Sequence, residues 1–135
     1  MAQATLFSLF YAADAARARV ESRLATVGLS IPKLAALQHL VEAGDSLPLG
    51  QLAERLSCVK SNVTQLIDRL DADGFVSRAD DPNDRRSRLA VITATGRKAY
   101  ESGIRIQRET EQEIFAALTL AEARQFAELV GKLRG

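Results

Sequence analysis

The chain has 135 residues, which is the size of a single domain. Hydrophobic residues make up 47% of it and charged residues 26%, a composition that excludes disordered and low-complexity proteins. No apolar run approaches the roughly 20 residues that span a bilayer, so we expect a soluble, cytoplasmic protein with no membrane partner. The formal net charge of +1 identifies no partner, so a charged binding surface must be local.

The only cysteine and the only histidine limit the possible chemistry. Cys58 excludes a disulfide framework and a cysteine-based zinc site, and His39 alone excludes a histidine-rich metal site. The sequence has no G-x-S-x-G motif and no glycine-rich phosphate loop. We therefore predict no metal, no cofactor and no enzyme. Cys58 is predicted to be a small buried hydrophobic residue, with redox sensing as the alternative, and His39 to face solvent or a subunit contact.

Residues 4–27 are predicted to form an amphipathic helix that ends at Gly28. Apolar residues recur at three- and four-residue spacing: Leu6, Leu9, Phe10, Ala13, Ala16, Val20, Leu24 and Val27. Phe7 and Tyr11 form a second apolar stripe, which suggests that another subunit covers part of this helix. Because no basic residue precedes the apolar run at residues 6–13, we expect no signal peptide.

Three shorter helices are predicted next. Ser30 is a suitable N-cap for the first of them, and Gly44 ends it. Its inner face comprises Leu34, Leu37, Leu40 and Val41. A two-turn helix over residues 49–56 and a helix over residues 59–73 follow, with a brief break between them. Two helices joined in this way are typical of a helix-turn-helix.

The apolar period then changes from helical to extended. Residues 75–79 and 88–92 are predicted strands, joined by a segment rich in turn formers, so a hairpin wing follows the helix-turn-helix. Thr93 caps a long helix to about residue 117, and Thr119 opens a capping box for the last helix. The residues predicted to face inward on that last helix are Ala123, Phe126, Leu129, Val130 and Leu133.

The outer face of the 59–73 helix is predicted to bind DNA. At about 100° per residue, Ser61, Gln65 and Asp68 point outward when Val63 and Ile67 point inward. Amide and hydroxyl side chains suit base edges in a major groove, and a lysine at the helix start suits a phosphate. An ordinary solvated face usually carries acids, but positions 60–67 hold none. The predicted contact residues are Lys60, Ser61, Asn62, Thr64, Gln65 and Arg69.

The hairpin tip is a second candidate contact. Residues 84–98 contain five basic residues against one acidic residue. Arg85, Arg86 and Arg88 suit a narrow minor groove, whose negative potential attracts arginine, and Asp84 is expected to hold a neighbouring arginine by a charge-assisted bond. The alternative for this segment is a solvated turn with internal ion pairs.

Residues 49–100 contain the segments LAERL and VTQLIDRLDADGFVSR, the pattern Asp81-Pro82-x-Asp84-x-Arg86, and Thr93-x-x-Gly96-Arg97. With these motifs, the segment resembles the MarR family of winged-helix transcription regulators. It implies a homodimer in which each recognition helix enters a major groove and each wing touches an adjacent minor groove. Arg86 matches the wing-tip arginine, Asp84 the acid that orients the wing, and Arg78 a basic residue near the wing base; the resemblance thus adds all three to the predicted DNA-binding residues. The family often has Ser or Thr at the start of the recognition helix, where this chain has Val59.

The resemblance also implies a small aromatic or anionic effector that binds between the DNA-binding and dimerisation parts. The candidate lining residues are Phe7, Phe10, Tyr11 and Arg17, for which core or dimer packing is the alternative. We expect a mainly α fold with a β-hairpin wing in one domain, residues 1–135. Residues 30–100 form its DNA-binding part, and residues 1–29 and 101–135 form dimerisation helices. The expected function is ligand-responsive repression on a pseudo-palindromic operator; a winged-helix protein-interaction module is the alternative.

Overall fold

The structure, a computed structural model, describes residues 2–56 and 62–135. Its elements in chain order are α1 (Ala2–Leu24), the 3-10 turn η1 (Ala25–Val27), α2 (Ile31–Glu42), β1 (Ser46–Pro48), α3 (Leu49–Leu56), α4 (Val63–Ala72), β2 (Val76–Asp80), β3 (Arg88–Ile92), α5 (Ala94–Phe115) and α6 (Leu120–Leu133). The predicted order of helices and hairpin is confirmed, as is the mainly α fold class. The strand β1 was not predicted.

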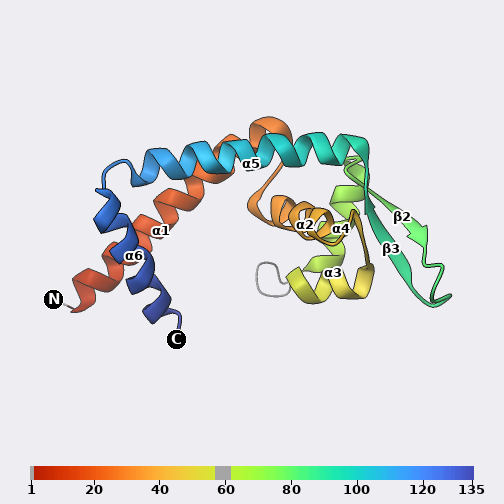
Figure 1. The fold of residues 1–135 in the computed structure, drawn as a ribbon, viewed down its shortest axis with the longest axis horizontal. Helices are drawn as coiled ribbons and strands as arrows, with labels where there is room; N and C mark the ends of the chain where they lie inside the picture. The colour runs from red at the N-terminus through yellow and green to blue at the C-terminus, as the bar shows by residue number, and fades with distance from the viewer. Residues whose placement is uncertain (1, 57–61) are drawn as a thin grey trace.

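The long helix α5 joins two groups of elements (Figure 1). Beneath its N-terminal end lie α2, α3, α4 and the β2–β3 hairpin, which projects from the molecule as a wing. Beneath its C-terminal end lie α6 and the N-terminal half of α1. The recognition helix and wing are therefore at the opposite end of the molecule from both chain termini.

Local capping chemistry sets the helix boundaries that the sequence predicts. The hydroxyl of Ser30 accepts a hydrogen bond from the Lys33 backbone N–H, and that of Thr93 accepts one from Gly96. At Thr119 the capping box is complete, because the Glu122 carboxylate also accepts from the Thr119 N–H. Gly28 ends the first helical segment with φ of 76°, a left-handed conformation that glycine adopts without steric cost.

A three-stranded antiparallel sheet lies in the order β1-β3-β2. The strand β1 has three residues, too few for an alternating pattern, and Pro48 leads directly into α3, so the sequence predicted no strand there. Asp45, which precedes β1, has φ of 83°, and its backbone carbonyl accepts a hydrogen bond from the Ile92 N–H. Its carboxylate also accepts from Arg97 in the first turns of α5. These contacts tie the base of the wing to α5.

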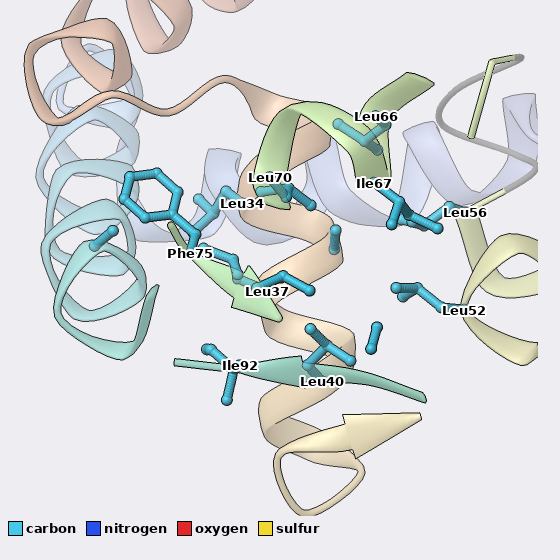
Figure 2. Packing of buried hydrophobic residues seen from close by; sticks show 14 of the residues in the cluster. Leu34, Leu37, Leu40, Leu52, Leu56, Leu66, Ile67, Leu70, Phe75 and Ile92 are labelled. Carbon is cyan, nitrogen blue, oxygen red and sulfur yellow. The ribbon is translucent and has the colours of Figure 1, made fainter. Parts of the chain in front are cut away.

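One hydrophobic core lies among α2, α3, α4 and the sheet (Figure 2). The fully buried leucines of this core are Leu24, Leu37, Leu40, Leu52, Leu56 and Leu70. Each contributes about 2 kcal/mol of favourable transfer free energy. Phe75 and Ile92 close the core at the base of the wing, beside Gly96 of α5, and Leu24 joins it from the end of α1. The core therefore fixes α4 so that its opposite face points to solvent.

The two ends of the chain expose large apolar side chains. They are Leu6, Phe7, Leu9, Phe10 and Tyr11 on α1, and Leu120, Phe126, Leu129 and Leu133 on α6. Leu133 is 71% exposed, and no residue of α6, all of which the structure describes, is buried. The prediction that the apolar residues of the last helix face inward is therefore wrong within a single chain. Helical spacing identified the apolar stripe, but it does not tell whether the stripe packs on the same chain.

By length and composition, no single helix among the described residues could span a membrane, and only the bent pair Thr5–Val27 and Ile31–Glu42 satisfies that test jointly.

Candidate nucleic-acid interface

The outer face of α4 carries the predicted polar side chains. Leu66, Ile67 and Leu70 are buried against α2 and α3, whereas Thr64, Gln65, Asp68 and Arg69 are exposed. The outward orientation predicted for the residues of this helix that the structure describes is confirmed. Their use in DNA binding stays a prediction, as do the roles of Lys60 and Ser61, which lie outside the described residues together with Cys58 and Val59.

Asn62 is the N-cap of α4. Its Oδ1 accepts a hydrogen bond from the Gln65 backbone N–H at 3.0 Å, and its Nδ2 donates to Gln65 Oε1 at 3.2 Å. Its φ of −108° and ψ of 78° are not helical, so the helix begins at Val63. The predicted continuous helix over residues 59–73 is therefore interrupted at Asn62, and its residues 59–61 lie outside the described part of the chain. The physical reason is the strong capping preference of asparagine, which also supplies the cap that Val59 lacks.

Arg78, a predicted DNA-binding residue, forms ion pairs with two carboxylates within the chain. Its guanidinium donates to the carboxylate of Asp68, and its Nη1 lies 3.3 Å from Asp71 Oδ2. Arg78 stands on β2 and both aspartates stand on α4, so these bonds join the wing to the recognition helix. No periodic pattern in the sequence predicts this bridge, because its members come from a strand and a helix.

Two aspartates shape the wing tip through its backbone. Asp81 Oδ1 accepts a hydrogen bond from the Asn83 N–H, and Asp84 Oδ1 accepts one from the Arg86 N–H, both at 2.9 Å. The expected charge-assisted bond between Asp84 and an arginine side chain is not among the interactions of the described residues. Asp84 and Arg86 are two residues apart in the chain, and this spacing brings the Asp84 carboxylate to the Arg86 backbone N–H in an Asx turn. Within the part of the chain that the structure describes, the carboxylate therefore binds the backbone and not an arginine side chain. The turn at Asp81 was not predicted, although Asp81 and Asn83 have the same two-residue spacing as Asp84 and Arg86.

The arginines of the wing differ in their freedom. Arg85 and Arg86 are exposed at the tip, beyond the last paired residues of β2 and β3. The side chain of Arg88 lies 3.6 Å from Asp80 across the hairpin, with both groups more than half exposed. An exposed pair of this kind exchanges easily with other partners, so all three arginines remain available to a phosphate.

The aromatic residues predicted to line an effector site are exposed on the N-terminal half of α1. The ring of Phe7 lies 6.3 Å from that of Phe10 and 6.5 Å from that of Tyr11. Arg17, which follows Tyr11 further along α1, is also exposed. A more enclosed cavity of about 260 Å³ lies elsewhere, between α1, α2 and α5. It is lined by Val20, Leu24, Ile31, Leu34, Ala35, Gln38 and Gln107. The structure therefore does not bring the four predicted residues together around this cavity.

Within residues 2–56 and 62–135, no three histidine, cysteine, aspartate or glutamate side chains are grouped as metal ligands. His39, on α2, is partly buried.

Sequence comparison identifies the family of this fold. A sequence model of a protein family, described as "MarR family", matches residues 29–87 of the chain. An uncharacterized HTH-type transcriptional regulator of Bacillus subtilis, YfiV, is 34% identical over 62% of this chain, which spans 54% of that protein's length. A second one, YcgE, is 31% identical over 78% of this chain and 68% of its own length. The chain thus spans about half to two thirds of the length of these relatives.

Comparison with solved structures finds the same fold in transcriptional regulators. A probable transcriptional regulator from Pseudomonas aeruginosa is 28% identical with a TM-score of 0.80, and the match covers 94% of both chains. A mutant of MarR from E. coli, solved in complex with operator DNA, has a TM-score of 0.78 at 22% identity over 93% of this chain and 89% of that one. The polar outer face of α4, the arginine-tipped wing and these matches together show that the chain belongs to the MarR family of transcriptional regulators.

Proposed function

We propose that the chain binds double-stranded DNA as a homodimer and regulates transcription as a ligand-responsive repressor. The observation that carries this proposal is that α4 and the strands of the wing share one hydrophobic core. This core of α2, α3, α4 and the sheet holds the outer face of α4 beside the wing. With duplex DNA as its target, the protein would act in the cytoplasm.

The two surfaces suit two different grooves. Thr64 and Gln65 on α4 offer hydrogen-bond donors and acceptors without charge, which suits base edges in a major groove. Arg85 and Arg86 at the wing tip suit an adjacent minor groove, where arginine is attracted by the negative potential. Phosphate contacts from the other basic side chains of α4 and the wing would position the protein without selecting a DNA sequence.

The exposed apolar faces of α1 and α6 support a homodimer. Phe126 and Leu129 are 44% and 49% exposed, and large apolar patches on a soluble domain commonly mark interaction sites. We assign residues 1–29 and 101–135 to this contact and residues 30–100 to DNA binding. Two recognition helices related by a two-fold axis would read a pseudo-palindromic operator with half-sites about one helical turn apart.

The cavity between α1, α2 and α5 supports the response to a ligand. It lies where helices of the DNA-binding part meet α1 and α5, and five of its seven lining residues are apolar. A ligand that prefers a dimer geometry in which the two recognition helices no longer match their grooves would release DNA.

Selection from a pool of random duplexes tests the proposal. The protein should enrich a pseudo-palindromic sequence, and its affinity for that duplex, measured by fluorescence anisotropy, should fall steeply between two salt concentrations. Sedimentation should give twice the chain mass of 14.7 kDa. A folded dimer that binds no duplex even at low salt would instead favour a module for protein interactions.

A further inference from the structure

Arg78 joins the wing to the recognition helix at two points. Its Nη2 donates a hydrogen bond to Asp68 Oδ1, and its Nη1 donates to Asp71 Oδ2 at 3.3 Å. Asp68 and Asp71 are three residues apart, so they lie on one side of α4. One guanidinium therefore spans nearly a full turn of the helix.

The rest of the Arg78 side chain lies beside a largely apolar surface. It lines a hollow of about 260 Å³ between α3, α4 and β2, together with Leu49, Gly50, Ala53, Val63, Thr64 and Ile67. Only 32% of the side chain is exposed. The aliphatic stem covers apolar surface while the charged group reaches the two carboxylates, which is usual for arginine at the edge of a core.

We propose that Arg78 is a positioning residue that fixes the angle between the wing and α4. With this angle fixed, Gln65 and Arg86 reach their two grooves at the same time. The proposal rests on the DNA binding proposed above, and it replaces the direct DNA contact that the sequence predicts for Arg78.

The chemistry of the bridge requires arginine. A planar guanidinium offers donors in a rigid fork that can serve two carboxylates, whereas a lysine ammonium is a point charge on a flexible stem. Because exposed ion pairs add little to folding stability, the effect of this bridge is expected in DNA binding rather than in unfolding.

The two aspartates allow a direct test, because their alternative roles predict opposite changes in DNA affinity. Asp68 is 58% exposed and Asp71 is 42% exposed on the helix proposed to enter the groove. If their charge alone mattered, replacing them by asparagine would tighten binding, because DNA is a polyanion. If they hold Arg78 and thereby the wing, the same replacement weakens binding.

The experiment is a mutant cycle with R78M, D68N/D71N and the triple variant, on the duplex that the wild-type protein selects. We expect R78M and D68N/D71N each to weaken binding about tenfold, and the triple variant to weaken it no further than R78M, because the three residues act as one unit. R78K should lose affinity as R78M does. E42Q, at an exposed glutamate of α2 that is not among the predicted contact residues, is the matched control for loss of a carboxylate charge and should bind like wild type.

Three results would overturn the proposal: tighter binding by D68N/D71N, losses that multiply in the triple variant, or wild-type affinity in R78K. Thermal unfolding checks that every variant is folded, and we expect melting temperatures close to that of wild type. A wild-type protein that selects no duplex would remove the proposed function itself, so the two failures are distinguishable.

Discussion

Asn62 and Gln65 hold each other at the start of the recognition helix. The Asn62 side chain accepts a hydrogen bond from the Gln65 backbone N–H and donates one to the Gln65 side-chain oxygen. The same residue thus caps α4 and orients an amide on its outer face. Replacing the cap should change both the stability of the helix and its recognition of DNA.

Asn62→Ala should lower the free energy of unfolding by about 1 kcal/mol, because it removes the cap of α4. Asn62→Ser is the matched control: serine caps helices well but cannot donate to Gln65, so it should retain the stability. Denaturant unfolding measures the two variants. A loss of stability for serine equal to that for alanine would contradict the capping role.

Gln65→Ala should relax the preference for one base position in each half-site. An amide side chain can make two hydrogen bonds to an adenine edge, and such a pair is worth about 1–3 kcal/mol of discrimination. The measurement is the affinity for a set of duplexes that differ from the selected site at single positions. An equal loss on every duplex would contradict a base-reading role.

Arg86→Ala should weaken binding to all duplexes by a similar factor. Arg86 is exposed at the wing tip, which we propose enters a minor groove, where its charge lies between two rows of phosphates; its removal should therefore also reduce the slope of log affinity against log salt by about 1. Titrations at several salt concentrations give the slope. An unchanged slope and affinity would show that the wing does not approach DNA.

Gly96→Ala should destabilise the fold by at least about 2 kcal/mol, since it overpacks the base of the wing. A Cβ at Gly96 would overlap the carbonyl of Phe75 and lie 3.0 Å from the side chain of Ile92. Gly50→Ala is the control, because nothing lies within 4 Å of a Cβ there. Gly50 is in α3, so this change should stabilise the protein by about 0.5–1 kcal/mol. Thermal unfolding compares the two.

Acidification should weaken the contact between α1 and α5. The Arg23 guanidinium, 2.6 Å from Glu113, lowers the pKa of that carboxyl by hydrogen bonding; the charges of Arg23 and Arg19 act in the same direction, and burial opposes them. Because the pKa is lowered on folding, the stabilisation is present above the ordinary value of 4.5 and is lost as pH falls through the folded-state pKa. Glu113→Gln should therefore be less stable than wild type near neutral pH, with the difference shrinking below pH 4.5. A difference that is constant with pH would contradict this linkage.

Much of the fold was predictable because each boundary has a local cause. Ser30, Thr93 and Thr119 cap their helices as expected, and Gly28 ends the first. The strand β1 was not predictable, because its pairing with β3 is non-local and it has only three residues. Burial on α6 was misjudged, because periodicity locates an apolar stripe without identifying its partner.

The candidate site was predictable in residue type more than in contacts. Helical geometry placed Gln65 and Asp68 on the outer face correctly, since that depends only on spacing. The bond between Arg78 and Asp68 depends on how a strand packs beside a helix, and sequence spacing carries no record of it. Capping by Asn62 was open to prediction from its residue type, but the apolar repeat that includes Val59 favoured an earlier start.

The uneven distribution of the core has a consequence for how the protein responds to dilution. The elements from α2 to β3 share buried leucines, whereas α6 has no buried residue and the described part of α1 is largely exposed up to Val20. If a second copy covers these faces, mass action makes the order of the terminal helices depend on protein concentration, while the winged unit keeps its own stability. At low protein concentration, the distance between the two winged-helix units of a dimer would then become variable before either unit unfolds.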